Sequence, residues 1–209
     1  MVIPTRIVNE ILALIRSDMA PFGGYLHLDR KNHDLPDCDE PGYFTCEGDK
    51  PVISVAIGSR LNTEWLPMVL HEYSHFQQWK EDSLVWRNCF IGTVDVSDIA
   101  NLWIDGIIDL PGNTSLKIFG SLAKLEYEAE KNTIKLMRRF DLQMYVDITR
   151  YIMEANVYIS SYFWARYYRI WFPQLWKDEK LVDLMPVDLI DYVTPEASKY
   201  VHNKIWSPC

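Results

Sequence analysis

Clustered positive charge, long apolar runs and closely spaced cysteine pairs are all missing from this sequence. Its 209 residues include 21 Lys or Arg and 29 Asp or Glu, which gives a net charge of -8, and the longest basic cluster is Arg138-Arg139. This balance argues against binding to the phosphate backbone of nucleic acids. No segment is long and apolar enough to cross a membrane, and Asn9, Glu10 and Arg16 interrupt the apolar N-terminal pattern that a secretion signal needs. We therefore expect neither nucleic acid nor membrane as a partner.

The spacing of the four cysteines argues against a small protein held together by disulfides. Cys38, Cys46, Cys89 and Cys209 have no CxxC spacing, and in a chain of this length they do not form the pattern of a disulfide framework. This usage favours a reducing, cytoplasmic setting. A Cys38–Cys46 bridge or a minor metal site stays open as an alternative.

Apolar spacing predicts an α+β fold that is mostly α, in a single domain of two closely packed lobes. Residues 5–18 have helical spacing, 25–28 alternate and 52–57 are β-branched, which predicts a helix and a small sheet with a polar loop between its strands. Longer helical patterns cover about 114–140 and 145–172. The domain, residues 1–209, divides into a lobe with the sheet and a further helix (1–85), a loop-rich insert (86–115), a helical lobe (116–172) and a proline-broken tail (173–209). Within the insert, we expect Ser97 or Asp98 to cap a short helix.

The further helix of the first lobe carries the run His71-Glu72-Tyr73-Ser74-His75, which has the pattern HExxH. Because residues four apart lie on one helix face, both imidazoles can bind one Zn²⁺, while the carboxylate of Glu72 reaches a zinc-bound water. Chance produces this pattern in roughly one such chain in 150. Residues 62–64 offer cap residues and a first-turn acid, and the apolar neighbours of the motif predict a buried helix. Buried histidines need partners, and a metal ion supplies one.

A third ligand can be sought by periodicity in the pattern at 114–140. Glu126 and Glu130 lie within its apolar arc, whereas Glu128 falls on the lysine-rich opposite side, where a solvated salt bridge explains it. Two carboxylates on a buried face need cations or donors, so Glu126 can bind the metal while Glu130, one turn later, accepts a hydrogen bond from a ligand imidazole. The alternative pairs the two carboxylates with buried arginines such as Arg166 or Arg169.

These residues resemble the gluzincins, thermolysin-like metallopeptidases with HExxH on one helix and a Glu ligand on the next. The chain is most similar to zincin-like proteins of tailed bacteriophages, in which HEYSHFQQWKE precedes an ExxxE helix and an Ala-Asn-x-Tyr helix, here residues 155–158. The resemblance covers roughly residues 40–172. It implies a zincin-like fold with His71, His75 and Glu126 as zinc ligands, Glu72 as general base and Glu130 beside one histidine. Glu130 replaces the usual Asp, and the gap from His75 to Glu126 is longer than in thermolysin-like enzymes.

Two other third ligands stay open. Metzincins read HExxHxxGxxH, which would make Glu81 the ligand, but Gln78 replaces the glycine that turns the chain back towards the metal. Aspzincins carry Gly-Thr-x-Asp, which matches residues 92–95, but the Tyr-Gly that should follow is Asp98-Ile99. We rank Glu126 first, Asp95 second and Glu81 third.

The expected activity is zinc-dependent hydrolysis of peptide bonds in a peptide or protein substrate, with Glu72 as general base and the zinc-bound water as nucleophile. Tyr151, Asn156, Tyr158 or His202 could donate to the oxyanion. The aromatic residues of 145–172 are expected chiefly in the core, with a substrate cleft or partner interface as the alternative. The alternative function is a non-catalytic zincin-fold protein with structural zinc, acting as a phage structural or host-interaction component. The resemblance implies a location in the host bacterial cytoplasm or in the virion.

Overall fold

The computed structural model describes residues 2–29, 42–46, 50–58 and 60–206. Cys38 and Cys209 lie outside these ranges, and with them the alternative of a Cys38–Cys46 bridge. The chain forms two compact units, one of Met1–Glu81 with Ala129–Asp147 and one of Asp82–Glu128 with Ile148–Cys209. The division falls inside α5 (Gly112–Arg139), a continuous helix that contributes to both units.

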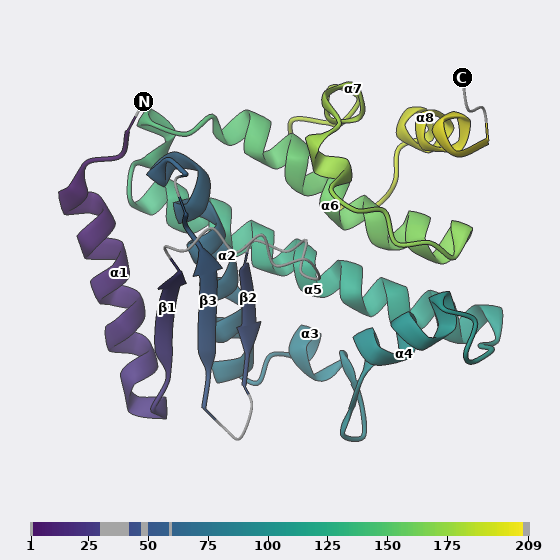
Figure 1. Ribbon diagram of the computed structural model, residues 1–209, viewed down its shortest axis with the longest axis horizontal. Helices are drawn as coiled ribbons and strands as arrows, with labels where there is room; N and C mark the ends of the chain where they lie inside the picture. The colour runs from purple at the N-terminus through teal and green to yellow at the C-terminus, as the bar shows by residue number, and fades with distance from the viewer. Residues whose placement is uncertain (1, 30–41, 47–49, 59, 207–209) are drawn as a thin grey trace. The chain divides into compact units, whose positions relative to one another are not determined.

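The first unit contains α1 (Thr5–Met19), the short helix η1 (Ala20–Phe22), three strands, α2 (Asn62–Lys80) and the short helix η3 (Leu142–Met144). The strands β1 (Tyr25–Asp29), β2 (Gly42–Thr45) and β3 (Val52–Ala56) form one sheet in the order β1-β3-β2 (Figure 1). β1 runs parallel to β3, with Tyr25 beside Val52, and β2 runs antiparallel to β3, with Gly42 beside Val55. Ile53 and Val55 of the central strand are fully buried, so the β-branched strand expected at residues 52–57 forms and directs one face into the core.

Strand β2 differs from the sequence prediction, which placed a polar loop between the two expected strands. Residues 42–45 instead form a strand because the free edge of β3 supplies their hydrogen-bonding partner. Their sequence, Gly-Tyr-Phe-Thr, does not alternate between apolar and polar side chains and so carries no strand signal of its own. Phe44 of this strand packs edge-on against Phe76 of α2, with ring centroids 6.3 Å apart.

Helix α2 begins differently from the prediction based on residues 62–64. Leu61 is its N-cap, and no side chain caps it. The side chain of Asn62 instead accepts a hydrogen bond from the backbone N–H of Ile3 at 2.9 Å and donates to the Ile3 carbonyl at 2.7 Å. Further along α2, Tyr73 donates to the carboxylate of Asp18 at 2.8 Å, and Lys80 forms an ion pair with the same carboxylate. These contacts fix α2 against α1 and the N-terminal segment.

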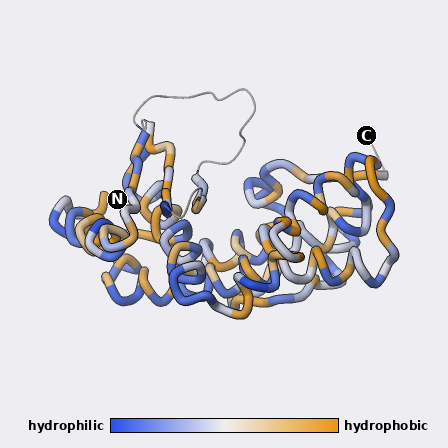
Figure 2. Tube along the Cα trace, turned by 90° about the horizontal axis from the view of Figure 1, so that it is seen from below, coloured by the Kyte–Doolittle hydropathy of each residue, from blue (hydrophilic) through white to orange (hydrophobic). Residues whose placement is uncertain are grey.

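The second unit contains most of the helices. After α3 (Leu84–Arg87) a two-stranded hairpin of β4 (Phe90–Ile91) and β5 (Val94–Asp95) leads to α4 (Val96–Ile104). The remaining elements are the first part of α5, α6 (Ile148–Tyr168), η4 (Leu175–Lys177), α7 (Glu179–Val182) and α8 (Pro195–Trp206). Hydrophilic and hydrophobic residues are interspersed along the chain in Figure 2, as expected of helices that bury one face.

Two boundaries in the second unit correct the sequence prediction. The N-cap of α4 is Asp95, whose carboxylate accepts from the backbone N–H of Ser97 at 2.7 Å, so neither Ser97 nor Asp98 caps this helix. In the expected proline-broken tail, Pro195 begins α8 instead of ending a helix. A proline fits the first helical position because its missing N–H has no partner to lose there.

The described residues are thus mostly helical with two small sheets, and the predicted α+β, mostly α class is confirmed at this level. None of the described helices combines the length and apolar character that crossing a bilayer requires.

Candidate metal centre

The two histidines of the HExxH run lie one turn apart on α2 with their rings together. Their Nε2 atoms are 3.1 Å apart, and the ring centroids are 4.7 Å apart at an interplanar angle of 86°. His75 is 8% exposed, and the side chain of His71 is 12% exposed. The helix therefore places two nearly buried imidazoles edge to face, with one nitrogen of each directed at the other.

The second nitrogen of each ring contacts an oxygen that can only accept a hydrogen bond. Nδ1 of His75 lies 2.9 Å from Oε1 of Gln78, and Nδ1 of His71 lies 3.1 Å from Oε1 of Glu130. The first contact is a hydrogen bond and the second an ion-pair contact, and a tautomer with the proton on Nδ1 suits both oxygen acceptors. Glu130 was expected to accept a hydrogen bond from a ligand imidazole, and its carboxylate lies at ion-pair distance from His71.

This protonation pattern has a consequence for the facing Nε2 atoms. With the proton on each Nδ1, both facing Nε2 atoms carry a lone pair, and two lone pairs 3.1 Å apart repel each other unless a cation lies between them. A shared proton or a metal ion can fill that role. Two nitrogen ligands of a tetrahedral zinc ion, each at about 2.05 Å, are separated by about 3.3 Å, close to the observed separation. The histidine pair therefore fits a bound zinc ion.

A row of polar contacts, most of them buried, fixes the register of α2 against α5. Ser74 Oγ lies 3.1 Å from Thr133 Oγ1, and the Asn132 amide donates to Ser74 at 3.1 Å and to Gln77 at 2.6 Å. Thr133 is fully buried. These contacts set the turn of α5 that carries Glu130 opposite His71. The sequence gives little sign of the pairing between Thr133 and Ser74, because its only signal is a small polar residue within the apolar face of each helix.

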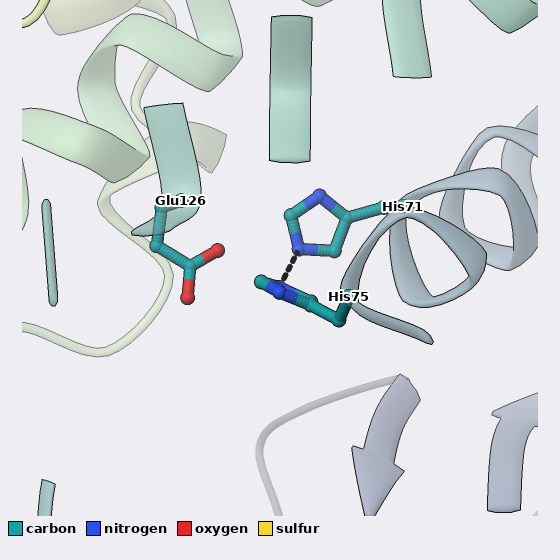
Figure 3. A group of neighbouring side chains, drawn as sticks. All are labelled: His71, His75 and Glu126. Atoms are coloured by element: carbon teal, nitrogen blue, oxygen red, sulfur yellow. Dashed lines mark hydrogen bonds between the residues drawn. The ribbon is translucent and has the colours of Figure 1, made fainter. Parts of the chain in front are cut away.

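Glu126 lies on α5 one turn before Glu130, on the same continuous helix. Its carboxylate faces the two imidazoles in Figure 3, and ligand atoms of His71, His75 and Glu126 all lie within 4.8 Å of one another. Within the described ranges, these three form the one group of His, Cys, Asp or Glu side chains close enough to share a metal ion. The structure therefore brings together the three residues that the sequence ranked first.

Three carboxylates of this region are buried. Glu72 and Glu126 are each 7% exposed, and Glu130 is 6% exposed. Burying ionised carboxylates is costly unless cations or hydrogen-bond donors compensate them. A divalent cation bound by Glu126 would offset two of these negative charges. Three buried carboxylates in this region are thus compatible with a divalent metal.

The other candidates for the third ligand, Asp95 and Glu81, are not part of this group. Asp95 caps α4, and Glu81 is the exposed C-cap of α2, as expected if the helix simply continues past Gln78. Glu128 forms a salt bridge with Lys124 at 3.2 Å on the more exposed side of α5, as predicted. The arginines of the alternative pairing have other partners: Arg166 donates to Ser115 and the Gly112 carbonyl, and Arg169 donates to the Trp103 carbonyl.

Asn156 and His202 are two of the four residues considered as oxyanion donors. The amide of Asn156 donates to the carbonyls of Pro186 and Asp188 and accepts from the N–H of Ile190, and His202 lies 3.3 Å from the hydroxyl of Tyr168. Tyr151 is half-buried on α6.

Tyr158, the fourth candidate, is connected to the predicted third ligand. Its hydroxyl lies 3.1 Å from that of Tyr162, which donates to Oε1 of Glu126 at 3.3 Å. Sequence reasoning did not single out Tyr162, because an aromatic residue on an aromatic helix carries no signal of such a contact.

Cys89 lies near this part of the second unit as a buried thiol. Burial raises its pKa to about 12, and the negative charges of Asp95 and Glu126 add to the shift. Its Sγ contacts the carbonyls of Val85 and Ser121 at 3.4 and 3.7 Å. A thiol protonated at neutral pH is a poor metal ligand and a poor nucleophile, so Cys89 is a core residue.

Comparison with known proteins adds no relative to this description. No protein-family model, no curated protein and no solved structure matches the chain. The candidate metal centre is therefore defined by its own geometry: two facing imidazoles, a carboxylate on the neighbouring helix and a buried glutamate between the histidines.

Proposed function

We propose that the protein is a zinc-dependent metallopeptidase in which His71, His75 and Glu126 bind Zn²⁺ and Glu72 is the general base. The observation that carries the proposal is the pair of Nε2 atoms facing each other at 3.1 Å while both Nδ1 atoms contact oxygen acceptors. Two imidazoles and one carboxylate are also the ligand set of zinc hydrolases that keep a fourth coordination position open.

In the proposed reaction, each side chain of the centre has its own role. Zinc, when bound, acts as a Lewis acid and lowers the pKa of water to about 7. Glu130 and Gln78 hold the two imidazoles in the tautomer that presents Nε2. The carboxylate of Glu72 accepts a proton from the attacking water and later delivers it to the leaving amine. A peptide bond is the substrate that uses both properties, since its carbonyl needs polarisation and its amine needs a proton.

The experiment measures zinc content and hydrolysis on wild-type protein and Glu72→Gln. Elemental analysis after dialysis without chelator should find about one zinc per chain in both, because Glu72 is not a ligand. A mixture of quenched fluorescent peptides should be cleaved by wild type and not by the variant. Equal cleavage by both proteins would refute Glu72 as the base, and a wild type without zinc after refolding with zinc would refute the metal site.

The same experiment distinguishes the proposed peptidase from the alternative function. A zincin-fold protein with structural zinc, acting in a phage particle or on a host protein, would bind one zinc and cleave none of the peptides. Its zinc would also have four protein ligands, since structural sites are closed. The extended X-ray absorption spectrum of the zinc protein distinguishes the two: three protein ligands and an exchangeable oxygen support the peptidase.

A further inference from the structure

The third ligand belongs to a hydrogen-bonded chain that reaches from α6 to α5 within the second unit. The hydroxyl of Tyr162 donates to Oε1 of Glu126 at 3.3 Å, and the hydroxyl of Tyr158 lies 3.1 Å from that of Tyr162. Both tyrosines are on α6, one turn apart, and Glu126 is nearly buried. A carboxylate that faces a metal site is thus also in contact with a phenol.

The direction of this chain follows from counting protons. A phenol has one O–H, and that of Tyr162 is directed at the carboxylate of Glu126. In the contact between the two hydroxyls, Tyr158 must therefore be the donor and Tyr162 the acceptor. A donor behind Tyr162 polarises its O–H and strengthens the bond to Glu126.

Aromatic packing fixes the two phenols. The rings of Tyr158 and Tyr162 meet edge to face with centroids 5.7 Å apart, Trp176 packs against Tyr158 at 5.5 Å, and Trp171 packs against Tyr162 at 5.7 Å. Each ring is therefore held on two sides, so the hydroxyls cannot follow a moving carboxylate. The aromatic residues of α6 were expected chiefly in the core, and here two of them, Tyr158 and Tyr162, also fix the positions of hydroxyl groups.

We propose that Tyr162 and Tyr158 are positioning residues for Glu126, holding its Oε1 so that Oε2 is presented to the metal. This inference rests on the proposed zinc site and adds to it the binding mode of the third ligand, which is monodentate. A carboxylate with one oxygen already engaged by a fixed donor has less rotational freedom to lose on binding a metal. Neither tyrosine takes part in the chemical steps through this role.

The test compares Tyr162→Phe and Tyr158→Phe with Tyr168→Phe as the matched control. All three remove one hydroxyl from α6, and the Tyr168 hydroxyl contacts His202 instead. Zinc affinity is measured by competition with a chromophoric chelator, and the Co²⁺-substituted proteins are compared by their visible spectra. Tyr162→Phe should bind zinc roughly 10- to 100-fold more weakly, as is usual when an outer partner of a ligand is removed. Tyr158→Phe should lose less, and Tyr168→Phe should match wild type.

The cobalt spectrum adds a readout that a loss of packing alone would not change. In Tyr162→Phe, Glu126 is free to bind through both oxygens, which raises the coordination number and lowers the intensity of the visible bands. If Tyr162→Phe matches wild type in affinity and spectrum while Glu126→Gln loses the metal, the inference is overturned and the zinc site stands. If wild type itself binds no zinc, both fail. Should metal-free Tyr162→Phe unfold, the zinc affinity of Tyr158→Phe decides, and an affinity equal to that of wild type there overturns the inference.

Discussion

The carboxylate of Glu130 lies 3.1 Å from Nδ1 of His71, and Glu126 lies one turn earlier on the same helix. One face of α5 thus carries both the proposed third ligand and the partner of the first. The contacts of Asn132 and Thr133 with α2 hold this face in register. The metal centre we propose therefore depends on how two helices pair along a polar line as much as on the HExxH run itself.

Replacing Glu130 with Gln should weaken zinc binding by about tenfold, at the low end of the range for outer partners of zinc ligands. The amide oxygen can still accept from Nδ1 of His71, but the negative charge that raises the basicity of the imidazole is lost. Competition with a chromophoric chelator at pH 7 measures the change. Glu128→Gln is the matched control, because Glu128 is two residues away on the same helix and pairs with Lys124. Equal affinities for the two variants would contradict the role of Glu130.

The identity of the third ligand can be decided by zinc content. Glu126→Gln should lose most of its zinc during dialysis without chelator, since an amide is a poor zinc ligand. Asp95→Asn and Glu81→Gln should retain about one zinc per chain, because Asp95 caps α4 and Glu81 is an exposed C-cap. Elemental analysis on the four proteins, treated together, measures the outcome. Loss of zinc in the Asp95 or Glu81 variant with retention in Glu126→Gln would show that the ranking is wrong.

Stability should fall in alkaline solution because of Cys89. Its pKa rises from 9.0 to about 12 in the folded protein, chiefly through burial. A group whose pKa is raised on folding contributes stability that is complete below its unfolded pKa and is lost as the pH rises towards the folded value. The free energy of unfolding should therefore decline above pH 9, by up to about 1.4 kcal/mol per pH unit from this thiol.

The comparison protein for this pH dependence is Cys89→Ala. Burial also raises the pKa of Tyr73, together with its hydrogen bond to Asp18, but that tyrosine is present in both proteins and its effect cancels. Urea denaturation between pH 8 and 10.5 should give a steeper decline for wild type than for the variant. Parallel curves over this range would show that the thiol ionises in the folded state as readily as in the unfolded one.

Periodicity predicted the elements that are long or regular. The helix at residues 5–18, the long helix with Glu126 and Glu130 on its buried side and the β-branched central strand all follow from one-dimensional patterns. What it missed depends on partners far away in the chain. Strand β2 exists because β3 offers an edge, and Tyr162 contacts Glu126 across 36 positions of sequence. Such pairings are set by how the elements pack, which no local pattern of residues contains.

Asn156 gives a case in which a residue suggested for chemistry has a structural role. It is fully buried, and its side chain makes three hydrogen bonds of 2.9 Å: it donates to the carbonyls of Pro186 and Asp188 and accepts from the N–H of Ile190. Asn156→Ala would leave three backbone groups without this partner. Since each buried group that loses its partner costs about 1–3 kcal/mol, the variant should lose roughly 3 kcal/mol or more of its unfolding free energy.

Urea denaturation measures this loss, and Asn101→Ala serves as the control. Asn101 is exposed and accepts one hydrogen bond, from the indole of Trp171 at 2.8 Å, so its removal should cost only about 0.5–1.5 kcal/mol. At a temperature where Asn156→Ala is still folded, its zinc content should equal that of wild type, because Asn156 is not among the proposed ligands or their partners. A variant of wild-type stability that fails to cleave peptides would instead return Asn156 to the list of oxyanion donors, since only a role in the reaction would then explain the loss.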